Sequence, residues 1–181
     1  MCGIAGILST SLAPGAARSA AVQMQQGLRH RGPDDSGLWQ SPDGTATLAH
    51  QRLSILDLSG AARQPMSTPD GRFTICFNGE IYNFHELRQD LEQAGVEFRT
   101  TSDTEVILRL YERYGIDCAK RLRGMFAFAI WDARERTCAL ARDPLGIKPL
   151  YLHQTETTLA FASELRALIK GQLFAPTLRQ E

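Results

Sequence analysis

The sequence carries no excess of charge of either sign. Twenty Lys and Arg residues are balanced by twenty Asp and Glu residues, so the formal net charge is zero. Neutralising phosphates requires a basic excess, so this balance argues against nucleic-acid binding and against attachment to an anionic membrane surface. No run approaches the ~18 consecutive apolar residues of a membrane-spanning helix, so we expect no transmembrane segment.

Cysteine is scarce, and its spacing matches no metal-binding or disulfide pattern. Four cysteines stand far apart without a Cys-x-x-Cys pair: Cys2, Cys76, Cys118 and Cys138. We therefore expect neither a zinc or other metal site nor a disulfide framework. The first residues also lack the basic segment that opens a secretory signal peptide, so the cytoplasm is the expected compartment.

The length and composition are those of one ordinary globular domain. The chain has 181 residues, of which 43% are hydrophobic and 22% charged. A domain of this size buries roughly 70% of the surface that its unfolded chain exposes, which is enough to fold without cross-links. Neither an internal repeat nor a linker divides the chain, so we predict one domain over residues 2–181.

Apolar periodicity predicts helices and strands in irregular alternation. Helical spacing covers residues 16–30, a segment from Asn83 to Gly95, and a segment from Ser102 to Gly115 in which Glu105 would complete a capping box. Residues 31–37 are predicted to form a loop because of their Gly and Pro content. Strands are predicted at residues 4–8, 45–50, 72–77, 125–131, 137–142, 151–152 and 159–162.

The stretch from Met125 to Trp131 is apolar without alternation. A strand with this pattern has to be covered on both of its faces. Short hairpin-like links between neighbouring strands favour antiparallel pairing. We therefore predict an α+β fold in which helices cover antiparallel sheet.

The second residue is a candidate nucleophile. A free cysteine has a pKa of about 8.5 and needs a nearby base, yet none of the four histidines stands in a recognisable catalytic context. Removal of Met1, which is usual before a small residue, would free the α-amine of Cys2, and such an amine has a pKa of about 7.7 to 8.0. One residue would then supply nucleophile and base. Taken alone, a cysteine here is more often an incidental buried residue.

Short motifs spread over nearly the whole chain. They are residues 1–6 (MCGIAG), 29–34 (RHRGPD), 50–55 (HQRLSI), 77–83 (FNGEIYN), 102–105 (SDTE), 123–129 (RGMFAFA), 142–151 (RDPLGIKPLY) and 162–164 (ASE). In this order they resemble the glutaminase domain of class II glutamine amidotransferases, specifically that of glutamine-hydrolysing asparagine synthetases. The resemblance implies the N-terminal-nucleophile hydrolase fold, an αββα sandwich of two stacked antiparallel sheets between helical layers.

The resemblance also implies how a free glutamine molecule is held. Arg52 would pair with the substrate carboxylate, and Glu80 and Asp103 would receive its ammonium group. The segment that starts at Arg52 would hold the substrate partly through its main chain, with Leu53, Ser54, Ile55 and Leu56. Without the family, Arg52 is interpreted as a solvated charge, Glu80 as an exposed acid beside a turn, and Asp103 as a favourable acid in the first turn of a helix.

Asn78 and Gly79 have two competing interpretations. By the resemblance, the Asn78 side-chain amide and the Gly79 backbone N–H form an oxyanion hole. An Asn-Gly pair is also the strongest short signal for a two-residue hairpin turn. The position between a predicted strand and Glu80 matches the family motif, so we favour the oxyanion hole.

The implied activity is glutamine hydrolysis through a γ-glutamyl thioester on Cys2, which needs no metal or organic cofactor. The resemblance assigns residues 29–34 to a loop that closes over the site and excludes water. It assigns no sharp role to Arg31 or to residues 142–151. Of these, residues 142–151 are expected to pack against a neighbouring domain.

Nothing in the chain matches the ATP-using part of complete asparagine synthetases. Neither a Ser-Gly-Gly-Leu-Asp-Ser-type loop nor a G-x-x-x-x-G-K-[S/T] loop occurs. We therefore expect an ATP-dependent synthetase domain or subunit as the partner that receives ammonia, and apolar surface left bare in its absence would favour a homodimer. Two other functions stay open: a non-catalytic module that binds glutamine or a synthetase, and acyl transfer from a different amide.

Overall fold

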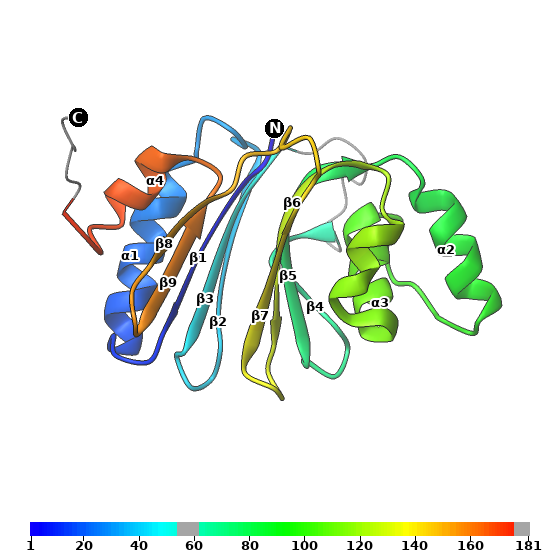
Figure 1. The fold of residues 1–181 in the computed structure, drawn as a ribbon, viewed down its shortest axis with the longest axis horizontal. Helices are drawn as coiled ribbons and strands as arrows, with labels where there is room; N and C mark the ends of the chain where they lie inside the picture. The colour runs from blue at the N-terminus through cyan, green and yellow to red at the C-terminus, as the bar shows by residue number, and fades with distance from the viewer. Residues whose placement is uncertain (54–61, 176–181) are drawn as a thin grey trace.

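The computed structural model describes residues 1–53 and 62–175, which form two stacked β-sheets between two helical layers. Figure 1 shows α1 and α4 outside one sheet and α3, with α2 beside it, outside the other. The helices are α1 (Pro14–Gly27), α2 (Phe84–Gln93), α3 (Asp103–Tyr114) and α4 (Leu165–Lys170), with a 3-10 helix, η2, at Gly115–Arg121. The predicted αββα sandwich is confirmed.

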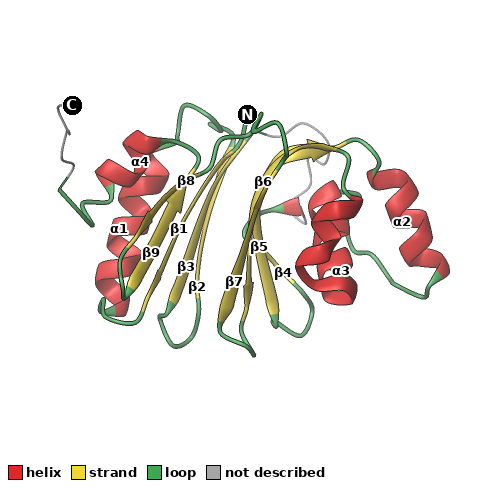
Figure 2. Ribbon diagram, viewed as in Figure 1, coloured by secondary structure: helices red, strands yellow, loops and turns green. Residues whose placement is uncertain are grey.

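The first sheet has five antiparallel strands in the order β2-β3-β1-β9-β8. Their bounds are β1 (Gly3–Ser9), β2 (Asp35–Gln40), β3 (Ala46–Arg52), β8 (Tyr151–Gln154) and β9 (Thr158–Ala162). The central strand β1 pairs with β3 on one side and β9 on the other, starting at Gly3 opposite Gln51. The chain therefore begins at one end of the central strand, at the top of the view in Figure 2.

The second sheet has four antiparallel strands in the order β4-β5-β6-β7. Their bounds are β4 (Met66–Ser67), β5 (Phe73–Ile81), β6 (Gly124–Asp132) and β7 (Thr137–Arg142). β5 and β6 pair along their whole lengths, which places Asn78 opposite Ala127 and Gly79 opposite Phe126. Both of these β5 residues are therefore held by regular strand pairing.

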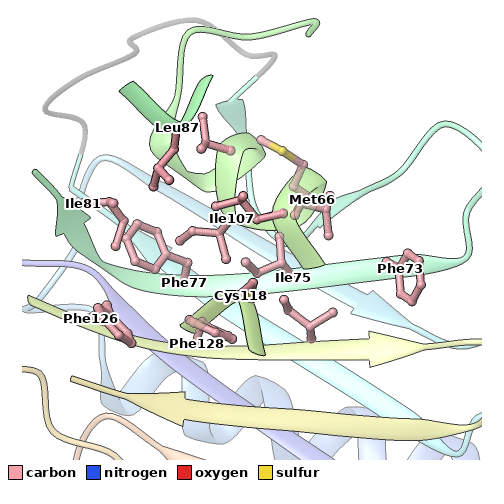
Figure 3. Packing of buried hydrophobic residues seen from close by; sticks show 14 of the residues in the cluster. Met66, Phe73, Ile75, Phe77, Ile81, Leu87, Ile107, Cys118, Phe126 and Phe128 are labelled. Atoms are coloured by element: carbon pink, nitrogen blue, oxygen red, sulfur yellow. The ribbon is translucent and has the colours of Figure 1, made fainter. Parts of the chain in front are cut away.

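β6 is buried on both faces, as its apolar run predicts. Side chains on one face, including Phe126 and Phe128, join the core beneath α3, and both are visible in Figure 3. Side chains on the other face meet the first sheet, where Ala127 and Ala129 pack in one cluster with Phe161. The small alanines leave room for this large ring between the sheets.

The core of the second half lies between the β5–β6 pair and the two helices. Ile107 of α3 and Leu87 of α2 point toward Ile75 and Phe77 of β5 (Figure 3). Each such side chain contributes about 1.5–3 kcal/mol when it is fully buried. This packing fixes α3, and with it the residues at its N-terminal end, against β5.

The start of α3 differs in part from the predicted capping box. The Ser102 hydroxyl accepts a hydrogen bond from Glu105 N at 3.3 Å, as predicted. The Glu105 carboxylate, however, accepts from the backbone N–H groups of Thr100 (2.7 Å) and Arg99 (3.0 Å), and not from Ser102. The reciprocal half of the prediction is wrong because this buried acid holds the preceding loop.

Local sequence missed several short elements. β2 begins at Asp35, inside the segment predicted as a loop, and α4 carries too little periodicity to be recognised. Asn83 does precede α2, but its side chain bonds to the main chain of Arg121 and Arg123 and does not cap the helix. Among the described helices, none is long and apolar enough to span a membrane.

Gly6 tests the close packing between the sheets. A Cβ added at Gly6 would lie 2.4 Å from the Phe161 ring, which is fully buried. We expect Gly6→Ala to lower the free energy of unfolding by about 1–3 kcal/mol, measured by chemical denaturation. Gly15→Ala is the control because a Cβ there meets nothing within 4 Å. Equal stability of Gly6→Ala and the wild type would contradict the packing.

Candidate active site

A cavity opens at the end of the sandwich where the chain begins. Its walls come from the start of the chain, the end of β3, the strand β5, the N-terminal end of α3 and the β7–β8 connection. Ser54, Ile55 and Leu56 lie outside the described residues. All the other residues of the predicted site line this one cavity: Cys2, Arg52, Leu53, Asn78, Gly79, Glu80 and Asp103. Their individual roles stay predictions.

Cys2 is held at its sulfur by the main chain of Leu53. Leu53 N donates to Sγ at 3.4 Å, and Sγ lies 3.6 Å from Leu53 O, to which it donates. Burial raises the pKa of the Cys2 thiol above its usual range, and the Leu53 hydrogen bond and the positive charges of the amino terminus and Arg52 offset only part of this effect. A thiol with a raised pKa is a weak nucleophile unless a base lies close by.

Arg31 holds the other end of the same residue. Its Nε donates to Cys2 O at 2.9 Å, and its Nη1 pairs with Glu164 Oε1 at 3.0 Å. The Arg31 side chain is only 8% exposed. Sequence reasoning assigned Arg31 no role, because the contact joins two motifs that are distant in the chain.

Asn78 and Gly79 lie inside β5, so the hairpin interpretation is wrong. Regular pairing with β6 continues through both residues. Asn78 is 1% exposed, and its Nδ2 finds no hydrogen-bond acceptor among the described residues. A buried amide donor without a partner is uncommon, because it costs about 1–3 kcal/mol. Asn78 therefore offers a donor at the wall of the cavity.

Gly79 permits a close approach between β5 and β6. A Cβ at this position would lie 2.3 Å from the carbonyl oxygen of Met125, which is too close for any side chain. The requirement for glycine thus comes from sheet packing beside the cavity. No turn is involved.

Asp103 is a buried acid at the N-terminal end of α3. Its Oδ2 accepts a hydrogen bond from Ile81 N at 3.1 Å. Burial is the largest influence and raises the pKa of the Asp103 carboxyl to about 6, against backbone hydrogen bonds from Ile81 and Thr104 that lower it. The charge of Glu80 acts in the same direction as burial. The cavity therefore concentrates negative charge where a cation would relieve it.

Lys148 is a cavity residue that sequence reasoning missed. Asp143 shapes the β7–β8 connection: its carboxylate accepts from the N–H groups of Phe126 (3.2 Å), Ile147 (2.9 Å) and Lys148 (3.0 Å). This loop directs Lys148 into the cavity wall, where it is 5% exposed, while Leu145 stays 84% exposed. The sequence analysis placed Lys148 in a motif, residues 142–151, without a role, because the sequence does not show the direction of the lysine.

Gln64 ties the walls together. Its Oε1 accepts from Phe77 N at 2.6 Å, and its Nε2 donates to Thr104 Oγ1 at 3.2 Å. It is 9% exposed and lines the cavity. These bonds link the segment before β4 to β5 and to the first turn of α3, so Asn78 and Asp103 share a rigid support.

A cysteine at the head of the central strand of a two-sheet αββα sandwich defines the N-terminal-nucleophile fold class. The solved structure of glutamine phosphoribosylpyrophosphate amidotransferase from B. subtilis superimposes with a TM-score of 0.77 at 24% identity, over 94% of this chain and 44% of that one. A structure described as the allosteric regulatory enzyme of purine biosynthesis gives 0.75 at 25% identity. It covers 94% of this chain and 43% of that one.

The family follows from sequence comparison. The family model described as "Glutamine amidotransferase domain" matches residues 1–181, and the chain belongs to this family. It is 44% identical to asparagine synthetase [glutamine-hydrolyzing] 1 of Bacillus subtilis over 95% of this chain and 27% of that protein. It is 41% identical to a probable asparagine synthetase of Dictyostelium discoideum over 97% of this chain and 32% of that protein. The predicted resemblance is confirmed, and the chain spans about a quarter to a third of these relatives.

The buried charge of Asp103 lowers stability. The folded state holds a proton on this acid more tightly than the unfolded chain does, so its contribution to stability falls as pH rises from 3.8 to about 6. This gap corresponds to at most about 3 kcal/mol. Asp103→Asn keeps an oxygen for Ile81 N and removes the charge. We therefore expect a higher free energy of unfolding at pH 7.5 than in the wild type, and little difference at pH 3.5.

Chemical denaturation at the two pH values measures this effect. Asp90→Asn, at an exposed position of α2, is the control and is expected to change stability at neither pH. If Asp103→Asn were destabilised equally at both pH values, the acid would be a structural hydrogen-bonding residue and not a strained binding group.

Proposed function

We propose that this domain hydrolyses glutamine to glutamate and supplies the released ammonia to an ATP-dependent synthetase. One observation carries the proposal: a single cavity gathers a cysteine at position 2, a buried amide donor that no described residue satisfies, an arginine and two acids. These groups match the reacting amide and the two charged ends of one free amino acid.

Substrate recognition follows from charge. The Arg52 guanidinium offers paired donors to the α-carboxylate of glutamine. Asp103 and Glu80 face the α-ammonium group, whose positive charge favours ionisation of Asp103. An amide buried within a protein chain carries neither charged end, so this arrangement favours a free amino acid over a peptide. Residues 54–56 are proposed to hold the substrate further through their main chain.

The chemistry begins with proton transfer inside one residue. After Met1 is removed, the α-amine of Cys2 accepts the thiol proton, directly or through one water. The thiolate attacks the side-chain carbonyl carbon of glutamine, and the resulting oxyanion is stabilised by the Asn78 amide and the Gly79 N–H. The carbon–nitrogen bond then breaks, and the α-ammonium returns the proton to the leaving ammonia.

The second half of the reaction releases glutamate. Water attacks the γ-glutamyl thioester while the α-amine takes a proton from it. The carbon–sulfur bond breaks, and the thiolate recovers that proton. Metal and organic cofactors take no part in the proposed steps.

A partner that uses the ammonia is part of the proposal. The relatives named above as asparagine synthetases are three to four times longer than this chain, as the shares of 27% and 32% indicate. Leu145 and Ile147 are 84% and 51% exposed on the connection whose next residue, Lys148, lines the cavity. An apolar surface next to the site supports docking of a synthetase there, with aspartate as the proposed final acceptor.

Deleting the nucleophile tests the reaction. We expect glutamate release from glutamine by the wild type, none by Cys2→Ala, and normal release by Cys138→Ala, which alters a cysteine outside the cavity. Intact mass of the active protein is expected to show loss of Met1. Binding without release would support a non-catalytic module, release only from other amides would support a different acyl transfer, and full activity with Met1 retained would contradict the α-amine as base.

Asn78 tests the oxyanion hole. Because its amide is proposed to bond the oxyanion formed during reaction, Asn78→Ala should lower kcat about 100- to 1000-fold with little change in KM for glutamine. Asn83→Ala is matched to it in chemistry, since its amide bonds only to main chain outside the cavity, and should keep kcat. A kcat within threefold of the wild type for Asn78→Ala would remove it from the mechanism.

A further inference from the structure

The segment that joins β9 to α4 holds the beginning of β1. Ser163 is fully buried, and its hydroxyl accepts a hydrogen bond from Ile4 N at 3.0 Å while its own N–H donates to Ile4 O at 2.9 Å. Residue 4 is thus fixed through both of its main-chain polar groups. The next residue, Glu164, accepts a hydrogen bond from Arg31, and Arg31 in turn donates to the carbonyl oxygen of Cys2.

Glu164 contacts three basic side chains. Its Oε1 accepts from Arg31 Nη1 at 3.0 Å and lies 2.9 Å from His30 Nε2, and its Oε2 accepts from Arg166 Nε at 2.6 Å. Arg166 also contacts the His30 ring. The bonds to these groups outweigh the effect of burial and lower the pKa of Glu164 to about 2. The carboxylate is therefore ionised throughout the range in which enzymes work.

Arg31 connects Glu164 to Cys2. Its Nη1 is fixed by Glu164 and its Nε donates to Cys2 O at 2.9 Å. With the sulfur held by Leu53, the carbonyl and the side chain of Cys2 are both anchored. The α-nitrogen is the remaining polar group of Cys2, and it is the group proposed above to transfer protons. Its position depends on how the carbonyl and the sulfur are held.

We propose that Glu164 is a positioning residue for glutamine hydrolysis, which acts through Arg31 to set the position of the Cys2 α-amine and to balance the positive charge beside it. This inference rests on the proposed function and adds a residue to it. Glu164 touches neither substrate nor sulfur. Its effect is on the geometry and the proton affinity of the amine.

Two effects follow from removing the Glu164 charge. Arg31 loses its anchor, so the amine moves away from its working position, and a displacement of about 1 Å can cost on the order of 100-fold in rate. Arg31 also becomes an unbalanced cation near the amine, which disfavours the ammonium form and lowers the pKa of that amine. The substrate-binding groups Arg52 and Asp103 stay untouched.

The test uses Glu164→Gln in the processed protein, with rates expressed per active site titrated by an electrophilic glutamine mimic. We expect kcat to fall about 10- to 100-fold with KM for glutamine within about twofold. The acid limb of the kcat/KM profile should move to lower pH. Glu92→Gln is the matched control, because Glu92 pairs with Arg88 at 2.8 Å on the surface of α2, and it should leave rate and profile unchanged.

A double-mutant cycle separates positioning from general stability. In an Arg31→Gln background, Glu164→Gln should change kcat less than twofold, because its route to Cys2 is already gone. Thermal unfolding is recorded for each variant, and Glu164→Ala, which also removes the charge, replaces Glu164→Gln in the cycle if the latter does not fold. An equal loss in both backgrounds, a kcat within twofold of the wild type, or a loss of rate with an unshifted pH profile would overturn the proposal.

A measurement that needs no glutamine distinguishes failure of the proposed function from failure of the positioning role. If the wild type releases no glutamate, the rate of Cys2 alkylation by iodoacetamide still reports the site, because it follows the thiolate fraction and needs no glutamine. Loss of the Glu164 charge should then shift the alkylation profile to lower pH in Glu164→Gln and not in Glu92→Gln. Identical profiles would overturn the positioning role, whatever the substrate.

Discussion

The pairing of β1 between β3 and β9 is the constraint on which the site depends. Pairing with β3 from Gly3 and with β9 from Ala5 fixes the register of the central strand, so the residue before it lies at one end of the sandwich. A one-residue slip would turn Ile4 away from the space between the sheets and remove its bonds to Ser163. The long β5–β6 register then brings Asn78 and Gly79 to the same end from the other sheet.

Several cavity residues lower the stability of the domain when no ligand is bound. Burial raises the pKa values of both the Cys2 thiol and the Asp103 carboxyl, and Asn78 holds an amide donor that no described residue satisfies. Each arrangement has a cost that an apolar or paired residue would avoid. Hydrogen bonds of the surrounding structure keep these groups in place despite that cost. Gln64 links β5 to α3, and Glu105 links α3 to the loop before it. Groups strained in this way favour a ligand with complementary charge.

Local sequence was sufficient for the strong elements and for the family motifs. β6 was predicted as covered on both faces because seven apolar residues in succession leave no polar face, and Ser102 was recognised as the cap of α3. At Asn78-Gly79 the pair by itself favours a turn, but the position in the family motif argued against one, and the ladder with β6 runs through both residues. Sequence analysis assigned no role to Lys148 or Glu164. The Arg31–Glu164 pair spans 133 positions, and a contact at that separation leaves no periodic or local signal.

The contacts around Cys2 suit the role proposed above for its sulfur and its α-amine. Its sulfur is held by Leu53, its carbonyl by Arg31, and the strand that follows by β3 and β9. In the interior of a chain, the fourth connection would be a peptide bond, whose nitrogen is not basic. At a processed terminus the same nitrogen would be an amine, and such amines have a pKa of about 7.7–8.0 in model peptides. In the proposed mechanism this amine takes the place of the histidine base of other cysteine hydrolases, and removal of Met1 would give the anchored cysteine its own base.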